Sequence, residues 1–357
     1  LGLQISFAII ILKTSFGKAL FFYFNILIVK LISFADAGSD FLFTSFIPEV
    51  GYDQALINFA FRALPVIIFF SSLIAATYHL GVIQIIIKNI AKVMEKTMKT
   101  SGAETLSISA NIFVGQTEAP ILIRPYISKM TNSELMTVMV GGFSTVAGSV
   151  MALYVTWLNN IPEIAGHLLA ASVMSAPAAL MVAKIIYPET KSYQIISSNS
   201  INLKSQDNNL VDAIGRGATD GLKLAANVAA MLIAFISLVA MINFILGLLG
   251  TSMQEMLGLL FKPLAWTMGI PWADAKIVGT LMGEKIVLTE LIAFRDLSDY
   301  VSNNTISERS VIIASYALCG FANFGSIGIQ LGGIGSMAPK RKKDLSKLVF
   351  KAMLGGA

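Results

Sequence analysis

The sequence predicts an all-α polytopic membrane protein, built as an inverted repeat with two re-entrant helical hairpins and two broken transmembrane helices. Of its 357 residues, 55% are hydrophobic and only 13% are charged, against roughly 25% charged residues in a soluble domain. Several apolar runs reach the roughly 20 residues that a helix needs to cross a bilayer, and their continuity excludes an outer-membrane barrel. Two shorter apolar segments are interrupted by glycine and carboxylate residues.

The first elements are a partial helix and an apolar stretch, 19–34, in which Asn25 and Lys30 interrupt the hydrophobic pattern. We expect that stretch to lie along the outer membrane interface. Residues 63–87 are apolar and are predicted to span the membrane despite Pro65, which falls in the first turn, where a missing N–H costs little. The lysine-bearing stretch that follows is predicted to be a cytoplasmic surface helix.

Residues 105–128 are apolar enough to enter the membrane, but the sequence GQTEAP at 115–120 interrupts them. At about 1.5 Å rise per residue, each arm reaches only about halfway into a hydrocarbon core of about 30 Å. A re-entrant hairpin therefore fits better than a span. Its non-helical tip is tolerated at that depth only where it is buried in protein or lines a cavity.

The middle of the chain contains three predicted crossings. Residues 135–158 form a span interrupted at 141–142 and again at 144–145, ahead of Gly148 and Ser149. Residues 165–186 return to the cytoplasm, and 222–249 form the least polar span. The last of these is interpreted as scaffold or subunit contact, because few of its groups can bind a solute.

From residue 275 the earlier pattern repeats, with a short interrupted segment at 275–295 and a long one at 310–331. When the halves are superimposed, the pair Thr-Glu at 117–118 matches the pair Thr-Glu at 289–290. Three crossings separate the two short segments, so the second enters from the opposite face of the membrane. Paired broken segments in an inverted repeat indicate a transport site near the midplane.

Basic residues recur at 88–99 and 340–347, whereas 154–167 contains no lysine or arginine. The positive-inside rule places the first two segments in the cytoplasm and the third outside. These runs adjoin hydrophobic helices, so they predict topology in a bacterial inner membrane and no nucleic-acid partner. The chain begins at Leu1 and ends in a short apolar run, so both ends are interpreted as truncated.

Glu118 and Glu290 lie in apolar surroundings, where a lone carboxylate costs about 2.5 kcal/mol or more. Each must contact a ligand or, alternatively, pair internally with Arg124 or Arg295. We favour ligand contact, and the amide and hydroxyl neighbours predict a neutral solute with many polar groups. Those neighbours are Gln116, Thr117, Asn323 and Ser326. Lys285 is predicted either to bind such a solute or to act as a structural partner of Glu284 or of a helix end.

Carbonyl groups freed at the breaks can coordinate a small cation, and Asn111 and Thr145 are the side chains best placed to help. Such a site without a carboxylate favours sodium over a proton. The alternative is that both residues only bridge helices. We find no clustered metal ligands, no catalytic triad and no phosphate-binding loop, so no organic cofactor is expected.

Three motifs resemble the concentrative nucleoside transporter family: NIFVGQTEAP at 111–120, GEKIVLTELIAF at 283–294 and CGFANFGSI at 319–327. The resemblance covers nearly the whole chain and implies a homotrimer, in which a scaffold holds a mobile transport domain that moves as an elevator. It assigns Gln116, Thr117 and Glu118 to the nucleobase, with Val150 beside it. It assigns Glu290, Asn323 and Ser326 to the ribose, with Phe321 lining the pocket. Sodium is held by the side chains of Asn111 and Thr145 and by the carbonyls of Val114, Thr145 and Val146.

The resemblance also implies a division of the chain. The expected parts are scaffold helices at 1–87, transport domain at 88–190, a cytoplasmic loop at 191–215, a scaffold and trimer-contact helix at 216–262, and transport domain at 263–357. Relative to the family, the chain lacks an early helix and most of the last one. Thr289 stands where the family usually has asparagine, and Gly325 where it often has serine.

The predicted function is secondary active import of a nucleoside, such as uridine or adenosine, by sodium symport. Proton symport of the same substrates is the first alternative. A polytopic membrane enzyme with Glu118 and Glu290 as acid and base, and a passive channel, are alternatives from other classes.

Overall fold

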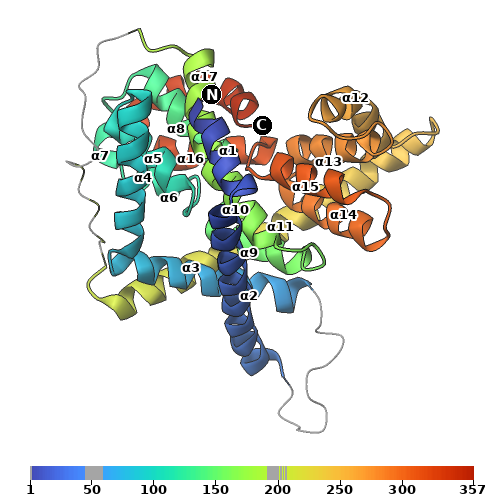
Figure 1. Ribbon diagram of the computed structural model, residues 1–357, viewed down its shortest axis with the longest axis horizontal. Helices are drawn as coiled ribbons and strands as arrows, with labels where there is room; N and C mark the ends of the chain where they lie inside the picture. Colours follow the sequence, from blue (N-terminus) through green and yellow to red (C-terminus); the bar gives the residue numbers. More distant parts are fainter. Residues whose placement is uncertain (1, 45–58, 191–200, 202, 204, 206) are drawn as a thin grey trace.

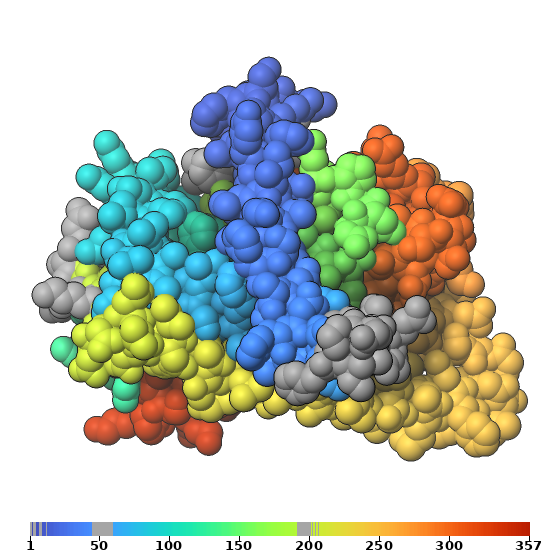
Figure 2. Space-filling view, turned by 90° about the horizontal axis from the view of Figure 1, so that it is seen from below, coloured from blue at the N-terminus to red at the C-terminus, as the bar shows by residue number. Residues whose placement is uncertain are grey.

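The computed structural model describes residues 2–44, 59–190, 201, 203, 205 and 207–357, and every extended regular element in them is helical (Figure 1). The chain opens with α1 (Gly2–Lys13) and α2 (Ser15–Phe43), and Thr14 caps α2 by accepting a hydrogen bond from the N–H of Gly17 at 3.0 Å. Figures 1 and 2 show α2 crossing α3 rather than running beside it. Because α2 is also long and apolar enough to span, its interfacial placement stays a prediction.

The predicted spanning helix at 63–87 is too long. A π-helical turn, Phe59–Ala63, leads into α3 (Leu64–His79), and α4 (Val82–Met98) follows separately. The two helices are divided at Gly81, whose φ of +84° is a left-handed conformation that favours glycine. The buried face of the amphipathic helix α4 includes Ile83, Ile87, Ala91 and Met94, whereas the lysines and several other apolar residues lie outside it.

Hairpin 1 consists of α5 (Gly102–Asn111), the connection 112–117, and the short helices α6 (Glu118–Ile121) and α7 (Arg124–Ile127). Ser101 and Glu104 form a capping box at the start of α5. The interrupted hairpin expected at 105–128 is therefore present.

The first broken helix comprises α8 (Asn132–Ser144) and α9 (Gly148–Trp157), followed by α10 (Ile164–Ile186) and the long α11 (Leu210–Gly247). α11 packs along α3. A Cβ at Gly217 would lie 2.8 Å from the carbonyl oxygen of Ser71, so the absence of a side chain permits this close approach. About half of the predicted loop at 191–215 lies outside the described residues, and its bound at 215 is wrong because α11 already begins at Leu210.

Hairpin 2 consists of α13 (Ala275–Val287) and α14 (Glu290–Ser302), with α12 (Met253–Thr267) packed against α13. The second broken helix comprises α15 (Glu308–Leu318) and α16 (Phe324–Met337), and a 3-10 turn, Pro339–Arg341, leads into α17 (Lys342–Gly356). Among the described residues, three helical stretches long and apolar enough to cross a membrane separate the hairpins. This spacing agrees with the inverted repeat.

Two large hydrophobic clusters hold the fold together. One joins α3, α9 and α10 to hairpin 2 and α15, and the other joins α4, hairpin 1 and α8 to α17. Each cluster therefore supports one hairpin, and the two breaks lie where the clusters meet. The backbones at the two breaks lie close together, because a Cβ at Gly320 of the second break would lie 2.8 Å from the carbonyl oxygen of Phe143 near the first.

Candidate functional site

Glu290 begins α14 at the tip of hairpin 2 and is 4% exposed. Its carboxylate accepts a hydrogen bond from Tyr154 Oη at 2.9 Å and another from Asn323 Nδ2 at 2.8 Å. Tyr154 belongs to the first broken helix, and its ring stacks on Phe294 with 4.4 Å between centroids. Both broken helices therefore position this carboxylate, and the donors offset the cost of burying it.

Gln116 connects the tip of hairpin 1 to the second broken helix. Its Nε2 donates to Ser326 Oγ at 3.3 Å, and its Oε1 accepts from Gln330 Nε2 at 3.1 Å. Gln330 Nε2 also lies 3.0 Å from the carbonyl oxygen of Met139 in α8. Because Gln330 is fully buried, this bridge fixes where the amide of Gln116 can lie.

The two hairpins meet at the start of α16. Asn323 is the N-cap of that helix, since its Oδ1 accepts from the N–H of Ser326 at 2.8 Å. The same asparagine donates to Glu290 of hairpin 2, and Ser326 accepts from Gln116 of hairpin 1. One helix N-terminus thus brings together four of the predicted substrate residues.

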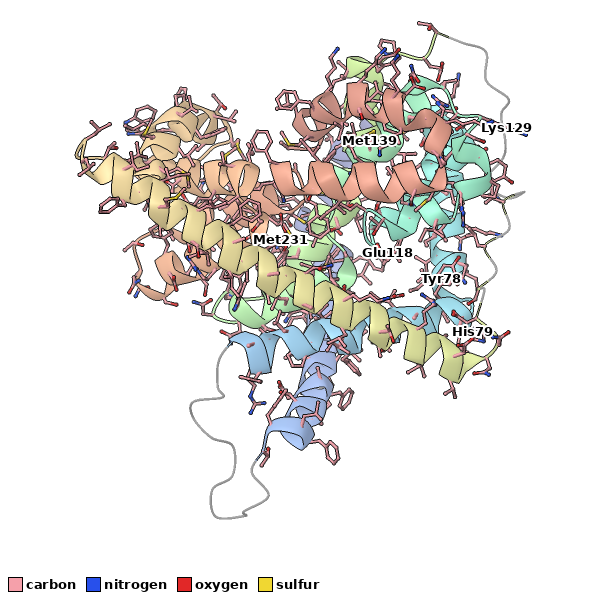
Figure 3. The ribbon with its side chains drawn as sticks, turned by 180° about the vertical axis from the view of Figure 1, so that it is seen from behind. Tyr78, His79, Glu118, Lys129, Met139 and Met231 are labelled. Atoms are coloured by element: carbon pink, nitrogen blue, oxygen red, sulfur yellow. The ribbon has the colours of Figure 1, made fainter. Side chains whose placement is uncertain are left out.

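Glu118 differs from Glu290 because it is exposed. Its Oε2 accepts from Thr117 Oγ1 at 3.1 Å, and a Cβ at Gly115 would lie 2.2 Å from the same oxygen. Glycine at 115 therefore leaves room for this carboxylate. In Figure 3, Glu118 lies toward the middle of the view, whereas Lys129 and His79 lie at its edge.

Asn111, the last residue of α5, is fully buried, and neither polar atom of its side chain has a partner among the described residues. Its amide faces Gly141 of α8, where a Cβ would lie 3.6 Å from Nδ2. Thr145 Oγ1 donates to the carbonyl oxygen of the same Gly141 at 3.0 Å, so its lone pairs stay free. Orphaned oxygen ligands beside a helix break fit a small cation.

The carbonyl groups assigned to the cation lie at the two breaks. Val114 follows α5 in the hairpin connection, and Val146 lies between α8 and α9; both residues are buried. The carbonyl of Phe113 accepts from the N–H of Gly148 at 3.1 Å, which joins the tip of hairpin 1 to this break. The structure therefore brings the predicted cation ligands into one region.

The two apolar residues of the predicted site are placed differently. Val150 is buried one helical turn before Tyr154, on the same face of α9. Phe321 lies between α15 and α16, is half-buried, and packs against the cluster that supports hairpin 2. Phe321 thus lies at the break before α16, whereas Val150 lies in the helix that also carries Tyr154.

Within the part of the chain that the structure describes, neither Glu118 nor Glu290 forms an ion pair. Glu290 bonds to Tyr154 and Asn323, while Arg295 Nε donates to Asp296 at 2.8 Å. Lys285 Nζ donates to the carbonyl oxygen of Ala317 at 3.0 Å, at the C-terminal end of α15. The helix-end alternative for Lys285 is therefore confirmed.

Two residues that depart from the family pattern have clear structural surroundings. Thr289 is the N-cap of α14 and accepts from the N–H of Ile292 at 3.3 Å, so it can replace asparagine in the capping role. A Cβ at Gly325 would lie 3.0 Å from Met231 Cε of α11, a flexible neighbour. The hairpin therefore keeps its geometry at Thr289.

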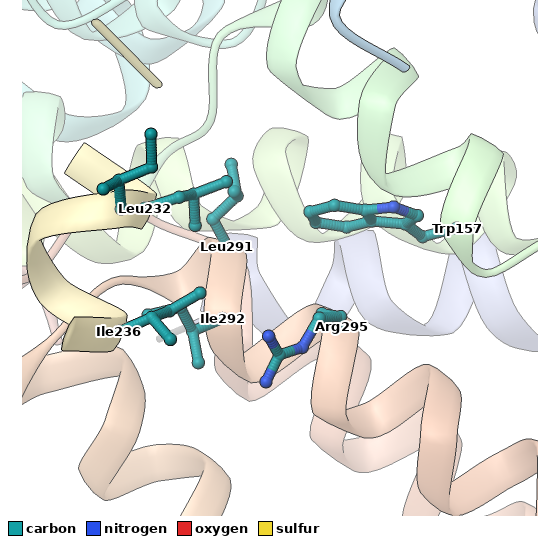
Figure 4. Close-up of a pocket in the computed structure, with 7 residues that line it drawn as sticks. Trp157, Leu232, Ile236, Leu291, Ile292 and Arg295 are labelled. Carbon is teal, nitrogen blue, oxygen red and sulfur yellow. The ribbon is translucent and has the colours of Figure 1, made fainter. Parts of the chain in front are cut away.

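A cavity of about 290 Å³ lies beside hairpin 2 (Figure 4). It is lined by Trp157, Leu232, Ile233, Ile236, Leu291, Ile292 and Arg295. The walls come from α9, α11 and α14 and are mostly apolar. Such walls lack the hydroxyl and amide partners that a polar solute needs, so this cavity is separate from the candidate site.

Tyr154 and Gln330 were not predicted. Each lies in a mostly apolar helix, and only its position one turn after Val150 or Ser326 gives a signal. In a membrane helix such residues tend to face protein rather than lipid.

Paired hairpins and broken helices that gather polar side chains inside apolar surroundings define a multi-pass membrane transporter. Three family profiles match the chain. They are "Na+ dependent nucleoside transporter N-terminus" at 1–46, "Nucleoside recognition" at 60–160 and "Na+ dependent nucleoside transporter C-terminus" at 167–357. The chain belongs to the Na+-dependent, or concentrative, nucleoside transporter family.

Similar proteins agree with this membership. The chain is 42% identical over 361 residues to the uncharacterized transporter YutK of Bacillus subtilis (strain 168), covering 99% of this chain and 87% of that protein. It is 41% identical over 381 residues to sodium/nucleoside cotransporter 1 of Mus musculus, covering 100% of this chain and 57% of that protein. The chain thus spans just over half the length of the mouse relative.

Solved structures confirm the predicted fold class. CNTnw in an inward-facing substrate-bound state matches with a TM-score of 0.91 and 41% identity, over 99% of this chain and 86% of that chain. A CNTnw variant in an outward-facing state matches with a TM-score of 0.91, at 40% identity and the same coverage of each chain. Since the relatives and the structural neighbours are transporters, the enzyme alternative is wrong.

Proposed function

We propose that this chain imports nucleosides across a bacterial inner membrane by sodium symport. The main support is the convergence of both hairpin tips on the start of α16, through Gln116–Ser326 and Glu290–Asn323. A site made from two oppositely inserted hairpins can be exposed to either side of the membrane when its supports move.

The nucleobase is assigned to Gln116, Thr117 and Glu118, with Val150 against its apolar face. Gln116 and Glu118 offer amide and carboxylate groups, which match the donors and acceptors on a base edge. Glu118 is exposed and bonded only locally, so it can change partners without breaking the fold.

The ribose is assigned to Glu290, Asn323 and Ser326, with Phe321 lining the pocket. Glu290 is an acceptor held by two donors, and sugar hydroxyls would replace one or both. Hydrogen bonds to an ionised acceptor are the strong ones, so a sugar with free hydroxyls is favoured over one without.

Sodium is the co-transported substrate, bound by the side chains of Asn111 and Thr145 and the carbonyls of Val114, Thr145 and Val146. The orphaned amide of Asn111 supports this assignment. Sodium there would order the connection 112–117, which carries Gln116. The conformational entropy of this connection is then lost when sodium binds and not when the nucleoside binds. The nucleoside therefore binds more tightly to the sodium-bound protein than to the sodium-free protein.

We further propose a homotrimer with an elevator movement. Apolar residues cover the exposed side of α11, including Ile233, Phe244 and Ile245, which suits a helix that faces lipid or other copies of the chain. Hairpin 1, hairpin 2 and the broken helices would move together, because the hydrogen bonds described above join them.

Uptake into proteoliposomes tests this proposal. With an inward sodium gradient, the purified protein should accumulate radiolabelled uridine or adenosine, and replacement of sodium by choline at fixed pH should abolish accumulation. Equal uptake without any cation gradient would contradict symport. Uptake driven by a pH gradient in choline would instead favour the proton-coupled alternative.

A further inference from the structure

A buried carboxylate outside the candidate site lies in α13. Glu284 is 1% exposed, and neither of its oxygens has a hydrogen-bond partner among the described residues. Thr280 of α13 and Tyr300 of α14 line one cavity, and Glu284 and Asp296 lie four residues nearer the tip on the same faces of these helices. Asp296 therefore lies across hairpin 2 from Glu284. The charge of Arg295 is already engaged, because its Nε donates to Asp296 at 2.8 Å.

Among the described residues, the groups that other elements place beside Glu284 carry no free positive charge. Helix α12 places the neutral amide of Gln254 beside it, and α14 adds the phenol of Tyr300. Asp299 adds further negative charge near Asp296. Lys285, the next residue along α13, donates to a carbonyl of α15 instead.

A polar cavity of about 260 Å³ lies one helical turn from this pair, on the side away from the hairpin tip. It is lined by Gln254, Glu255, Lys276, Ile277, Thr280 and Tyr300. Lys276 at its mouth pairs with Glu255 at 3.7 Å. Because Lys276, Thr280 and Glu284 follow one another at four-residue spacing, the cavity lies over the face of α13 that carries Glu284.

Two carboxylates that face one another in an apolar setting cannot both stay ionised, since like charges and desolvation each disfavour the second charge. We propose that Glu284 and Asp296 share one proton and form a proton-binding site in hairpin 2, separate from the nucleoside and sodium sites. The proton neutralises Glu284 and leaves the Arg295–Asp296 pair intact.

Loss of this proton places two negative charges between the arms of hairpin 2. Their repulsion moves α14, and with it Glu290, away from Tyr154 and Asn323. Alkaline pH therefore weakens nucleoside binding, a consequence that rests on the proposed function.

Calorimetric binding of uridine at saturating sodium, from about pH 6 to about pH 9.5, tests the consequence. Above its transition the wild-type affinity should fall about tenfold per pH unit, as one proton requires. Glu284→Gln, a neutral isostere of the protonated acid, should bind with no such fall, and the matched control Glu255→Gln should keep the wild-type fall. An unchanged fall in Glu284→Gln, or a transition that moves with sodium concentration, overturns the proposal.

Infrared spectroscopy tests the proton itself without nucleoside. The wild-type protein at neutral pH should show a protonated carboxyl band that disappears at alkaline pH and is absent from Glu284→Gln. If that variant fails to fold, the wild-type titration still decides, and a wild-type spectrum without the band overturns the proposal. Absence of uridine binding at every pH, with the band present, would contradict the proposed function and leave the proton site supported.

Discussion

Glu290→Gln tests the ribose assignment. The carboxylate accepts from Tyr154 Oη at 2.9 Å and from Asn323 Nδ2 at 2.8 Å. An amide of nearly equal volume offers only one acceptor oxygen, so one of these donors loses its partner. Bound sugar hydroxyls then meet a neutral acceptor in place of an ionised one.

The size of the effect follows from hydrogen-bond strengths. Bonds to a charged group contribute about 1.5–3 kcal/mol each, and neutral bonds about 0.5–1.5 kcal/mol. For two hydroxyls the difference is about 2–3 kcal/mol, which corresponds to a dissociation constant about 30- to 150-fold higher.

The assay compares equilibrium binding of uridine with that of its analogue lacking the 2′ and 3′ hydroxyls. Wild-type protein should prefer uridine, and Glu290→Gln should lose most of that preference. Glu308→Gln, an exposed carboxylate at the start of α15, is the control and should retain it. If Glu290→Gln weakens both ligands equally, Glu290 supports the fold and does not contact the sugar.

Three further predictions follow from other contacts. Thr145→Val removes the hydroxyl oxygen that is proposed to bind sodium, and it should raise the half-saturating sodium concentration about tenfold or more. Thr145→Ser keeps this oxygen and should stay near wild type. Equal effects of the two substitutions would argue against coordination by Thr145. Gln330→Leu leaves the acceptors on Gln116 and Met139 unpaired, so unfolding in detergent should become about 2–4 kcal/mol easier, and an unchanged thermal midpoint would refute the bridge. Hydrogen bonds from Arg216 lower the pKa of Asp207 to about 2, so that pair stabilises the fold above about pH 4 and less as pH falls toward 2. The difference in thermal midpoint between wild type and Asp207→Asn should shrink over that range, and a constant difference would contradict it.

The hairpins and broken helices could be predicted because their signal is local. A glycine-rich break with a carboxylate inside an apolar run, as at 115–120, is too polar for lipid and too apolar for a surface loop. Its repetition at 289–290 gave the second hairpin. The structure has both, at nearly the expected residues.

The prediction of one spanning helix at 63–87 was wrong because of a single residue, Gly81. Hydropathy continues through Gly81, so it cannot detect that a left-handed residue ends α3 and starts a helix in a new direction. Of the apolar residues after Gly81, Ile83 and Ile87 face the protein from α4 while Ile85 is exposed, and in sequence they resemble a continued span.

Contacts between distant segments could not be predicted from spacing. Tyr154 and Glu290 are separated by 136 residues, and Gln116 and Gln330 by 214. Sequence showed that Gln116 and Glu290 needed partners, but several amides and hydroxyls could have supplied them. Tyr154 and Gln330 are the partners because the packing of α9 and α16 places them beside Glu290 and Gln116.

The central claim is that sodium bound at the tip of hairpin 1 prepares the nucleoside site. Calorimetry of uridine binding in sodium and in choline, at equal ionic strength and pH, tests it most directly. We predict binding at least about tenfold tighter in sodium, and no such difference in Asn111→Leu. Equal binding by wild-type protein in the two salts would contradict the assignment of Asn111 and Thr145.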